Sequence, residues 1–359
     1  MYKQTFKIMR KLKFTKVGSL LLFVAIASMA LISGCKDDPV PVVEPADFAA
    51  LNAKISEAET LISTTSEGAD VGDYEIGSKV ELQKVIGDAK VVVASKTSDQ
   101  TAVDNTVTAL QAAMDLYETK KIAAIDPATL VGYWKFNEGS GTSAADASGN
   151  GFDGTFNTGR TNWGAGDPVW AEDRNGNAGK AISFNSGAWV EVPYNAAINP
   201  AQITIALWVN AAEIRESNRF LGLHSWNGYK FQLQSANKAF FTAASSEGIY
   251  DKDTDPVLNT GQWYHLAVSF GGGEMVFYID GFETNRVASL PGDLVNVTGH
   301  NLAIGVGSSK YADTPDNYDN DQIIPEAWGG YFNGSMDELR IYNTVLTGPQ
   351  VKSIYDDEK

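Results

Sequence analysis

Residues 130–343 are divided into short apolar-rich runs by turns in which glycine is frequent. Runs such as residues 203–211 (ITIALWVNA) and 262–270 (QWYHLAVSF) are rich in β-branched and aromatic side chains, which is typical of β-strands. Ten or more such runs follow one another with no helical pattern between them. Because each sheet must bury one face, this pattern predicts an all-β sandwich of two sheets.

Residues 47–121 have a different pattern, in which apolar side chains recur every three or four positions, as on one face of an α-helix. Ser78 and Glu81 form a capping-box pattern that predicts the start of the second helix. Three such helices predict a small all-α helical bundle ahead of the sandwich. The stripes are Phe48, Leu51, Ile55 and Ile62, then Leu82, Ile86, Ala89 and Val93, then Val103, Val107, Leu110, Met114 and Tyr117; a short last helix is predicted from Val351, Ile354 and Tyr355.

The N-terminal segment has the organisation of a targeting signal, with six basic residues up to Lys16 and an apolar run at residues 20–32. This run is too short and too poorly flanked for a membrane span. It ends in LISGC, which resembles the lipobox of bacterial lipoproteins, and the resemblance implies that Cys35 is lipidated. The alternative is a buried anchor helix that ends in an incidental cysteine. The following CKDD resembles the signal that sends lipoproteins of the Bacteroidetes to the outer face of the outer membrane.

Residues 1–35 are therefore expected to be a lipoprotein signal peptide with its lipobox. Residues 36–46 contain three prolines and few helix formers, so we expect an extended tether there. Within the helical block, residues 72–92 resemble the FIVAR-like modules of bacterial surface proteins. This resemblance implies that residues 47–121 are a three-helix spacer.

The charge of the chain restricts its partners. All 44 acidic residues but only 22 of the 28 basic residues follow Cys35, which is the single cysteine. Such a surface repels nucleic acid and anionic membrane, and it suits neutral ligands and cations. With Cys35 acylated, no thiol remains for disulfide or metal chemistry.

Six segments of the C-terminal region resemble, in order, the laminin G-like, concanavalin A-like jelly roll of bacterial carbohydrate-active proteins. The resemblance implies a domain at residues 128–357. This fold occurs in glycan-binding modules, adhesion domains and some glycoside hydrolases and lyases, so function must be argued from sites. The segments are LVGYWKFNEGSGTSAADASGNGFDGT, GKAISFNSGAWVEVP, ITIALWVN, GQWYHLAVSF, VFYIDG and YFNGSMDELRIYNTVLTGPQV.

Asp337 and Glu338 are adjacent acids that raise the question of a catalytic pair. Glycosidases need two carboxylates facing one sugar. Successive side chains of a regular strand point to opposite sides, so Asp337 is expected on the side of Leu339. Glu338 is then expected on the side of Arg340, as a surface pair. The Glu-x-Asp-x-x-Glu pattern of one large group of sandwich glucanases occurs nowhere in the sequence. We therefore expect no catalytic activity.

The three histidines, His224, His265 and His300, are too far apart in sequence for the usual zinc-ligand spacing. His265 resembles the histidine of the family's framework Trp-x-His motif, and it is expected to be structural and hydrogen-bonded. His224 is of more interest because Trp226 and Tyr229 follow it. His300 is expected in a turn.

Sugar recognition requires an exposed aromatic side chain beside hydrogen-bonding groups. Trp163, Trp226 and Trp328 lie in polar stretches, whereas Trp134, Trp208 and Trp263 lie within predicted strands and are expected in the core. The alternative for each of the first three is a plug beneath its own loop. The predicted ligand-binding residues are Trp226, Trp328, Trp163, Tyr229 and His224.

A structural calcium ion is predicted on resemblance. GSMDELRIYN resembles the family segment whose aspartate, here Asp337, contacts calcium, and DASGNG resembles the turn that faces it. The resemblance implies Asp146 and Asn150 as further ligands, with backbone carbonyls and water completing the shell. The alternative for Asp337 is a strand-end acid that caps a turn.

Together these features predict a cell-surface lipoprotein, anchored to the outer membrane, whose jelly roll binds carbohydrate without cleaving it. One alternative is a glycoside hydrolase or polysaccharide lyase with an unrecognised site. Another is a protein-binding adhesin that uses the same loops.

Overall fold

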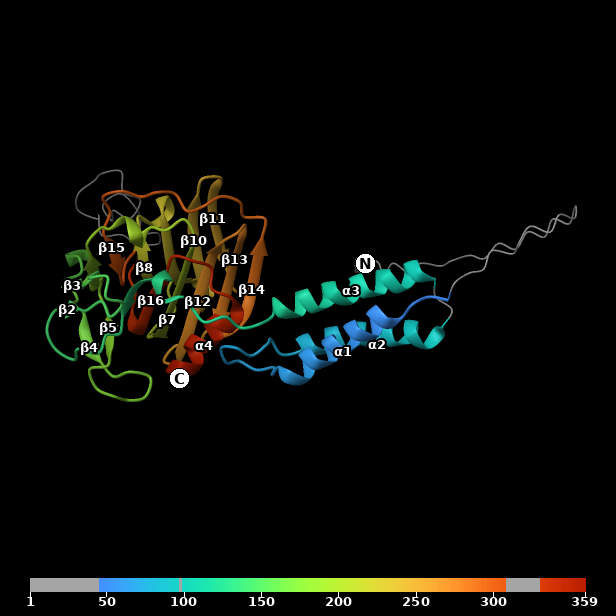
Figure 1. The fold of residues 1–359 in the computed structure, drawn as a ribbon. Helices are drawn as coiled ribbons and strands as arrows, with labels where there is room; N and C mark the ends of the chain where they lie inside the picture. Colours follow the sequence, from blue (N-terminus) through green and yellow to red (C-terminus); the bar gives the residue numbers. More distant parts are fainter. Residues whose placement is uncertain (1–44, 97–98, 308–329) are drawn as a thin grey trace, which may run out of the picture. The chain divides into compact units, whose positions relative to one another are not determined.

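The computed structural model describes residues 45–96, 99–307 and 330–359. The predicted signal peptide, with Cys35, and the predicted ligand residue Trp328 lie outside the described residues. Figure 1 shows three helices early in the chain, followed by the strands of two sheets and a last helix. The predicted order of an all-α bundle and an all-β sandwich is confirmed.

The three predicted bundle helices are α1 (Ala49–Thr64), α2 (Ser78–Ser95) and α3 (Gln100–Glu118). Their apolar stripes meet in one core, because residues three and four apart share a face. The side chain of Asp99 caps α3 by accepting a hydrogen bond of 2.7 Å from the backbone N–H of Ala102. The buried positions include Leu51, Ile55, Leu82, Ile86, Val103, Leu110, Met114 and Tyr117.

The predicted capping box at Ser78 and Glu81 is wrong. Gly77 precedes α2 in the left-handed conformation and provides no side-chain cap. The cap comes instead from Glu67, whose Oε1 accepts from the backbone N–H of Lys79 at 2.7 Å and from Ser78 Oγ at 3.3 Å. A carboxylate eleven residues before the helix thus accepts a hydrogen bond from a free N–H group of the first turn. A local sequence pattern cannot reveal such a cap.

The first sheet runs in the order β14-β13-β12-β7-β16-β5-β4, with β1 also paired to β16. At one edge, β14 carries Arg286, which is ion-paired to Glu283 and to Glu274 of β13. The strands are β1 (Leu130–Trp134), β4 (Val169–Ala171), β5 (Ala181–Phe184), β7 (Ile203–Ala211), β12 (Trp263–Gly271), β13 (Glu274–Ile279), β14 (Phe282–Ala288) and β16 (Gly334–Tyr342).

The second sheet runs in the order β11-β10-β9-β8-β15-β6-β3-β2. Neighbours in both sheets are antiparallel. The strands are β2 (Ser143–Ala144), β3 (Gly154–Asn157), β6 (Trp189–Val192), β8 (Ser217–Leu223), β9 (Tyr229–Gln234), β10 (Lys238–Ser245), β11 (Gly248–Asp253) and β15 (Leu302–Ile304); short 3-10 turns lie at η1 (Pro127–Thr129), η2 (Thr161–Trp163), η3 (Ala196–Ile198), η4 (Ser225–Asn227) and η5 (Ser235–Asn237).

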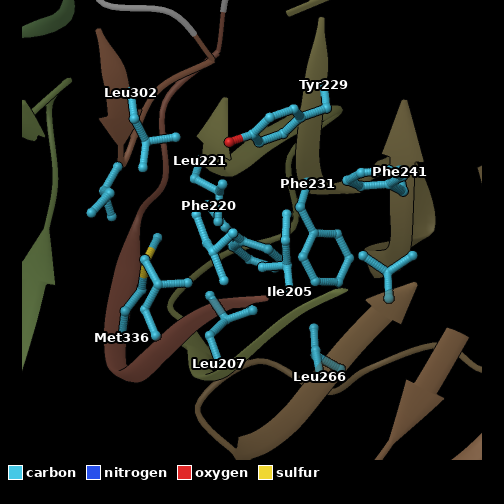
Figure 2. Packing of buried hydrophobic residues seen from close by; sticks show 14 of the residues in the cluster. Ile205, Leu207, Phe220, Leu221, Tyr229, Phe231, Phe241, Leu266, Leu302 and Met336 are labelled. Atoms are coloured by element: carbon cyan, nitrogen blue, oxygen red, sulfur yellow. The ribbon is translucent and has the colours of Figure 1, made fainter. Parts of the chain in front are cut away.

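The core lies between the inner faces of the two sheets. Figure 2 shows Ile205 and Leu207 of β7 and Leu266 of β12 facing aromatic side chains of the second sheet. Phe220 and Phe231 pack edge to face with ring centroids 5.3 Å apart, an arrangement that aromatic quadrupoles favour. Alternate residues of these strands therefore point away from the core.

The last helix, α4 (Gly348–Glu358), covers part of the outer face of the first sheet. It begins with a capping box formed by Thr347 and Gln350. Its buried Val351 and Ile354 pack against outward-facing Ala206 and Val276 of the sheet. The predicted short helix is confirmed.

Strand β16 is not regular, because a bulge lies between Asp337 and Arg340, which pair with Trp208 and Ala206 of β7. Glu338 has φ 53°, in the left-handed region. The bulge inserts one residue, so Met336 and Leu339 both enter the core.

No helix in the described part of the chain is long and apolar enough to span a membrane.

Candidate functional site

The outer face of the second sheet carries a row of polar side chains on β9. Phe231 and Leu233 enter the core, so Lys230, Gln232 and Gln234 point to the other face. These three residues border a cavity of about 300 Å³, which is in the size range of a small-ligand site. Trp226, Phe240, Glu216 and Asp251 also line this cavity, which we call the β9 pocket.

Trp226 lies in the turn η4, lines the pocket and is partly exposed. The turn begins after His224, which adopts the left-handed conformation with φ 57°. Arg219 of β8 is fully buried, and its Nη1 donates a hydrogen bond of 2.9 Å to Ser225 Oγ. Its guanidinium carbon lies 5.0 Å from the centroid of Trp226, so β8 holds the turn and the ring together.

Lys230 lines the pocket and is fully buried. Its Nζ is 3.8 Å from the ring centroid of Trp226 and 5.2 Å from that of Phe240, within the range of cation–π attraction. The same Nζ donates to Thr242 Oγ1 at 2.5 Å, and Thr242 donates in turn to Asp251 Oδ1 at 2.5 Å. The ammonium is thus coupled to an exposed carboxylate through a hydroxyl.

Gln232 lies beside Lys230 and is only 5% exposed. Its Nε2 is 3.5 Å from the carbonyl oxygen of Glu216, at the limit of a hydrogen bond. Its Oε1 has no hydrogen-bond donor among the described residues. Gln234, two residues along, donates to Asp253 Oδ2 at 2.5 Å. The pocket therefore combines two aromatic rings with amide, carboxylate and ammonium groups.

The structure places the predicted ligand residues in different environments. Trp226 borders the pocket, whereas Trp163 is buried at 8% exposure against Tyr331, with ring centroids 5.2 Å apart. The predicted role of Trp163 as an exposed platform is therefore wrong, and the plug alternative holds. Tyr229 is also wrong as a ligand residue, because it lies in the core and its hydroxyl donates to the carbonyl of Ile198 at 2.8 Å (Figure 2).

His224 is only partly buried, and its ring contacts that of His300 with centroids 3.7 Å apart and the ring planes tilted by 30°. The fold thus brings together two histidines that the sequence separates widely. Across the described ranges, no group of three or more histidine, cysteine, aspartate or glutamate residues is arranged to hold a metal ion.

Asp337 belongs to a second polar cluster, beneath α4 on the outer face of the first sheet. Its Oδ2 is 2.5 Å from Nη1 of Arg174, and Nε of Arg174 donates to the backbone carbonyl of Glu358 at 2.7 Å. Glu358 also forms an ion pair with Arg340, and its Oε2 accepts from Trp208 Nε1 at 2.7 Å. These contacts join α4 to the sheet.

The bulge overturns the expectation that Asp337 and Glu338 face opposite sides. Leu339 enters the core, whereas Asp337 contacts Arg174 on the outer face. Glu338 lies on that face too, where its Oε2 is 3.6 Å from Nη2 of Arg340, as predicted for this pair. The two acids nevertheless form no substrate site, because Asp337 is 2% exposed and is occupied by an arginine.

Burial and, after it, the neighbouring Glu338 carboxylate raise the pKa of Asp337 to about 7, while Arg174 acts in the opposite direction.

His265 of β12 lies on the other side of Trp208, with which it pairs across β7 and β12, and it is fully buried. Burial, with Arg340 and Arg174 nearby, lowers the pKa of His265 to about 3. The predicted hydrogen bond of this histidine is wrong, since neither ring nitrogen has a partner within the described ranges.

The three residues predicted to bind calcium have other partners. Asp337 is paired with Arg174. Asp146 accepts hydrogen bonds from the backbone N–H groups of Tyr133, Ser148 and Phe152 at 2.9, 2.9 and 3.0 Å. Burial opposes its ionisation, but these hydrogen bonds outweigh burial and lower the pKa of Asp146.

The amide nitrogen of Asn150 donates to the carbonyls of Leu130 and Val131, each at 2.9 Å. Backbone carbonyl oxygens of this kind would complete the coordination shell of a calcium ion. Here both accept hydrogen bonds from the Asn150 side chain instead. The side chains present do not fit a calcium site in this arrangement. Calcium binding stays a prediction.

Sequence reasoning missed Lys230, Gln232 and Phe240. The available signal was the alternation of long polar side chains in YKFQLQS, which begins three residues after Trp226. That alternation places Lys230 and Gln232 on one face, but the contribution of Phe240 depends on the pairing of β9 with β10.

Residues 184–352, which include the whole β9 pocket, match the family profile described as the concanavalin A-like lectin/glucanases superfamily. The predicted laminin G-like, concanavalin A-like domain is confirmed. A gellan lyase from a Bacillus species is 34% identical over 81 residues, which are 23% of this chain and 3% of the lyase. The chain thus spans only a small part of that relative.

Several solved structures are similar to this chain. Domain 4 of an extracellular GH43 arabinanase from Geobacillus stearothermophilus, in complex with arabinotriose, has 25% identity and a TM-score of 0.47, covering 63% of this chain and 98% of that one. The binding domain of Paraclostridial mosquitocidal protein 1 has 15% identity and a TM-score of 0.46, covering 64% and 52%. The binding domain of botulinum neurotoxin serotype C1 has 13% identity and a TM-score of 0.43, covering 65% and 53%.

Proposed function

We propose that this protein, whose residues 184–352 form a concanavalin A-like domain, binds carbohydrate in the β9 pocket without cleaving it. The observation that carries the proposal is that Trp226, which is partly exposed, lines a cavity together with Gln232, Lys230 and Asp251. A sugar ring stacks its apolar C–H face on an indole, and its hydroxyls bond to amides and charged groups around the rim. The lectin and glucanase membership of the family and the similarity to a gellan lyase segment support a glycan-related role.

A polysaccharide panel tests this function. Immobilised polysaccharides in affinity gels should retard the wild-type protein, and Trp226→Ala should reduce the retardation. A glycan array compared with an array of host proteins separates carbohydrate binding from a protein-binding adhesin. Retention by no polysaccharide, together with saturable binding to a protein, would reject the proposal.

A hydrolase or lyase is the second candidate, and one observation favours it. Glu216 and Asp251 both line the pocket, and hydrolysis of a glycosidic bond uses two carboxylates. Reducing-end and unsaturated-product assays on every polysaccharide that binds decide between the two. Turnover that disappears in both Glu216→Gln and Asp251→Asn would replace the binding proposal with an enzymatic one.

We further infer that the protein is a lipoprotein of the outer membrane facing the cell exterior. The inference is supported by the lipobox-like sequence that ends at Cys35 and by the CKDD that follows. In that setting the helical bundle serves as a spacer between the lipid anchor and the carbohydrate-binding domain.

A further inference from the structure

The side-chain oxygen of Gln232 lacks a hydrogen-bond donor in the described part of the β9 pocket. Gln232 is only 5% exposed, and its Oε1 has no hydrogen-bond donor within the described residues. An acceptor that is buried without a donor costs the folded protein its desolvation free energy. Because this oxygen belongs to a residue that lines the cavity, a ligand in the cavity can supply the missing donor.

The two carboxylates of the same pocket also favour a ligand that donates hydrogen bonds. Glu216 and Asp251 are exposed carboxylates, which only accept hydrogen bonds when ionised. Thr242 already uses its proton toward Asp251 Oδ1. The cation that lines the pocket, Lys230, is fully buried and directs a proton to Thr242.

We propose that the β9 pocket selects a neutral, polyhydroxylated sugar unit, whose hydroxyl donates to Gln232 Oε1, and that it rejects uronic acids. This inference rests on the proposed carbohydrate-binding function and adds the class of ligand. Each sugar hydroxyl donates one hydrogen bond, so the several hydroxyls of one sugar unit can satisfy Gln232 and the two carboxylates. An ionised carboxyl group has no proton to donate, and it meets Glu216, Asp251 and a chain of formal net charge −16.

The test compares uronic-acid polysaccharides with their carboxyl-reduced products, which have the same linkages but no charge. The full-length protein is titrated with each member of a pair at low ionic strength, where repulsion is least screened. We expect the neutral member to bind at least about tenfold more tightly than its acidic parent, the ratio that one lost hydrogen bond to a buried group produces. The double variant Glu216→Gln, Asp251→Asn should narrow this difference by improving binding of the acidic polymer.

Gln232→Met tests the acceptor directly, since methionine is similar in length and has no amide. It should weaken binding of the neutral polymer about tenfold. Its melting temperature should stay the same or rise, because the buried acceptor without a donor is removed. A merely structural Gln232 would instead give a lower melting temperature with unchanged affinity.

The outcomes separate the two proposals. No binding to any polymer rejects the carbohydrate function itself. Equal or tighter binding of the acidic members, with neutral binding intact, rejects the selection for neutral sugars and leaves the function standing. Unchanged neutral binding by Gln232→Met rejects Gln232 as the residue that recognises the hydroxyl.

Discussion

Trp226 and Trp163 both occur in polar stretches of sequence, but their side chains have opposite environments. Trp163 is 8% exposed, so Trp163→Ala should leave a cavity and lower the free energy of unfolding by about 3–5 kcal/mol. Trp226 is partly exposed at the pocket, so Trp226→Ala should weaken glycan binding about tenfold with a small effect on stability. Urea midpoints and affinity gels measure the two effects separately.

The two variants serve as controls for each other. If Trp163→Ala abolished glycan binding in urea-free buffer while remaining folded, the binding site would lie near Trp163 instead. If Trp226→Ala lowered the urea midpoint as much as Trp163→Ala, its role would be packing.

Asp337 and His265 lie on either side of Trp208 and should give opposite pH dependences. The pKa of Asp337 is raised from 3.8 to about 7 on folding, so between these values the folded state holds a proton that the unfolded state has lost, and stability falls as pH rises. The pKa of His265 is lowered from 6.5 to about 3, so stability rises with pH across that window. The two effects should largely cancel between about pH 4 and 6.5.

Single variants should reveal each slope. Asp337→Asn should make the free energy of unfolding increase with pH between about pH 4 and 6.5, by up to about 1.4 kcal/mol per pH unit. His265→Leu should make it decrease over the same range. Urea unfolding at several pH values measures both slopes. Parallel curves for the wild type and both variants would show that neither group changes its protonation on folding.

At the residue scale, the sequence indicated Trp226 as a candidate ligand residue but not the residues that line the pocket with it. An isolated tryptophan in a polar stretch is visible without a structure, because large apolar side chains are rare there. Lys230 and Gln232 are ordinary polar residues until β9 is known to turn them toward the same cavity. The two errors have different origins: Tyr229 follows Trp226 in sequence but joins the core face of β9, whereas Trp163 lies in a polar stretch but packs beneath its own loop.

At the scale of elements, the periodic segments were predictable and the irregular ones were not. The alternating runs at 203–211 and 262–270 became β7 and the main part of β12. The bulge at Glu338 has no local signal, because glutamate does not favour a φ of 53°. Contacts with residues distant in sequence, Arg174 for Asp337 and Tyr133 for Glu338, must stabilise it. One inserted residue was enough to place both acids on one face.

Thr347 should control the stability of α4. Its hydroxyl accepts a hydrogen bond from the backbone N–H of Gln350 at 3.4 Å, and the side-chain oxygen of Gln350 accepts one from the backbone N–H of Thr347 at 2.9 Å. Thr347→Ala should cost about 1 kcal/mol, whereas Thr347→Ser should preserve the cap. Amide hydrogen exchange within residues 348–358 should accelerate in the alanine variant alone. Equal exchange in both variants would show that packing of Val351 and Ile354 is sufficient to hold the helix.

At the scale of the whole molecule, calcium would join the first and last strands of the jelly roll. If the predicted site forms, a chelator should lower the melting temperature of the C-terminal domain, and added Ca²⁺ should restore it by mass action. Asp337→Ala should remove this dependence. The pairing of Asp337 with Arg174 predicts the opposite, namely no response to the chelator and a loss of stability in both Asp337→Ala and Arg174→Met.

The anchor proposal is tested in cells. Cys35→Ala should release the protein from membrane fractions or leave an uncleaved precursor. Protease added to intact cells should remove the native protein. Complete protection would contradict the surface location without contradicting the lipid anchor.

The outermost strands also determine how copies of the protein meet. The edge strand β14 carries Arg286 between Glu283 and Glu274, and the edge strand β11 carries Asp251 and Asp253. A second copy that tried to extend either sheet would have to bury these charges or place like charges in register. At β14 and β11, the charges that stabilise each strand therefore also disfavour edge-to-edge pairing with a second copy.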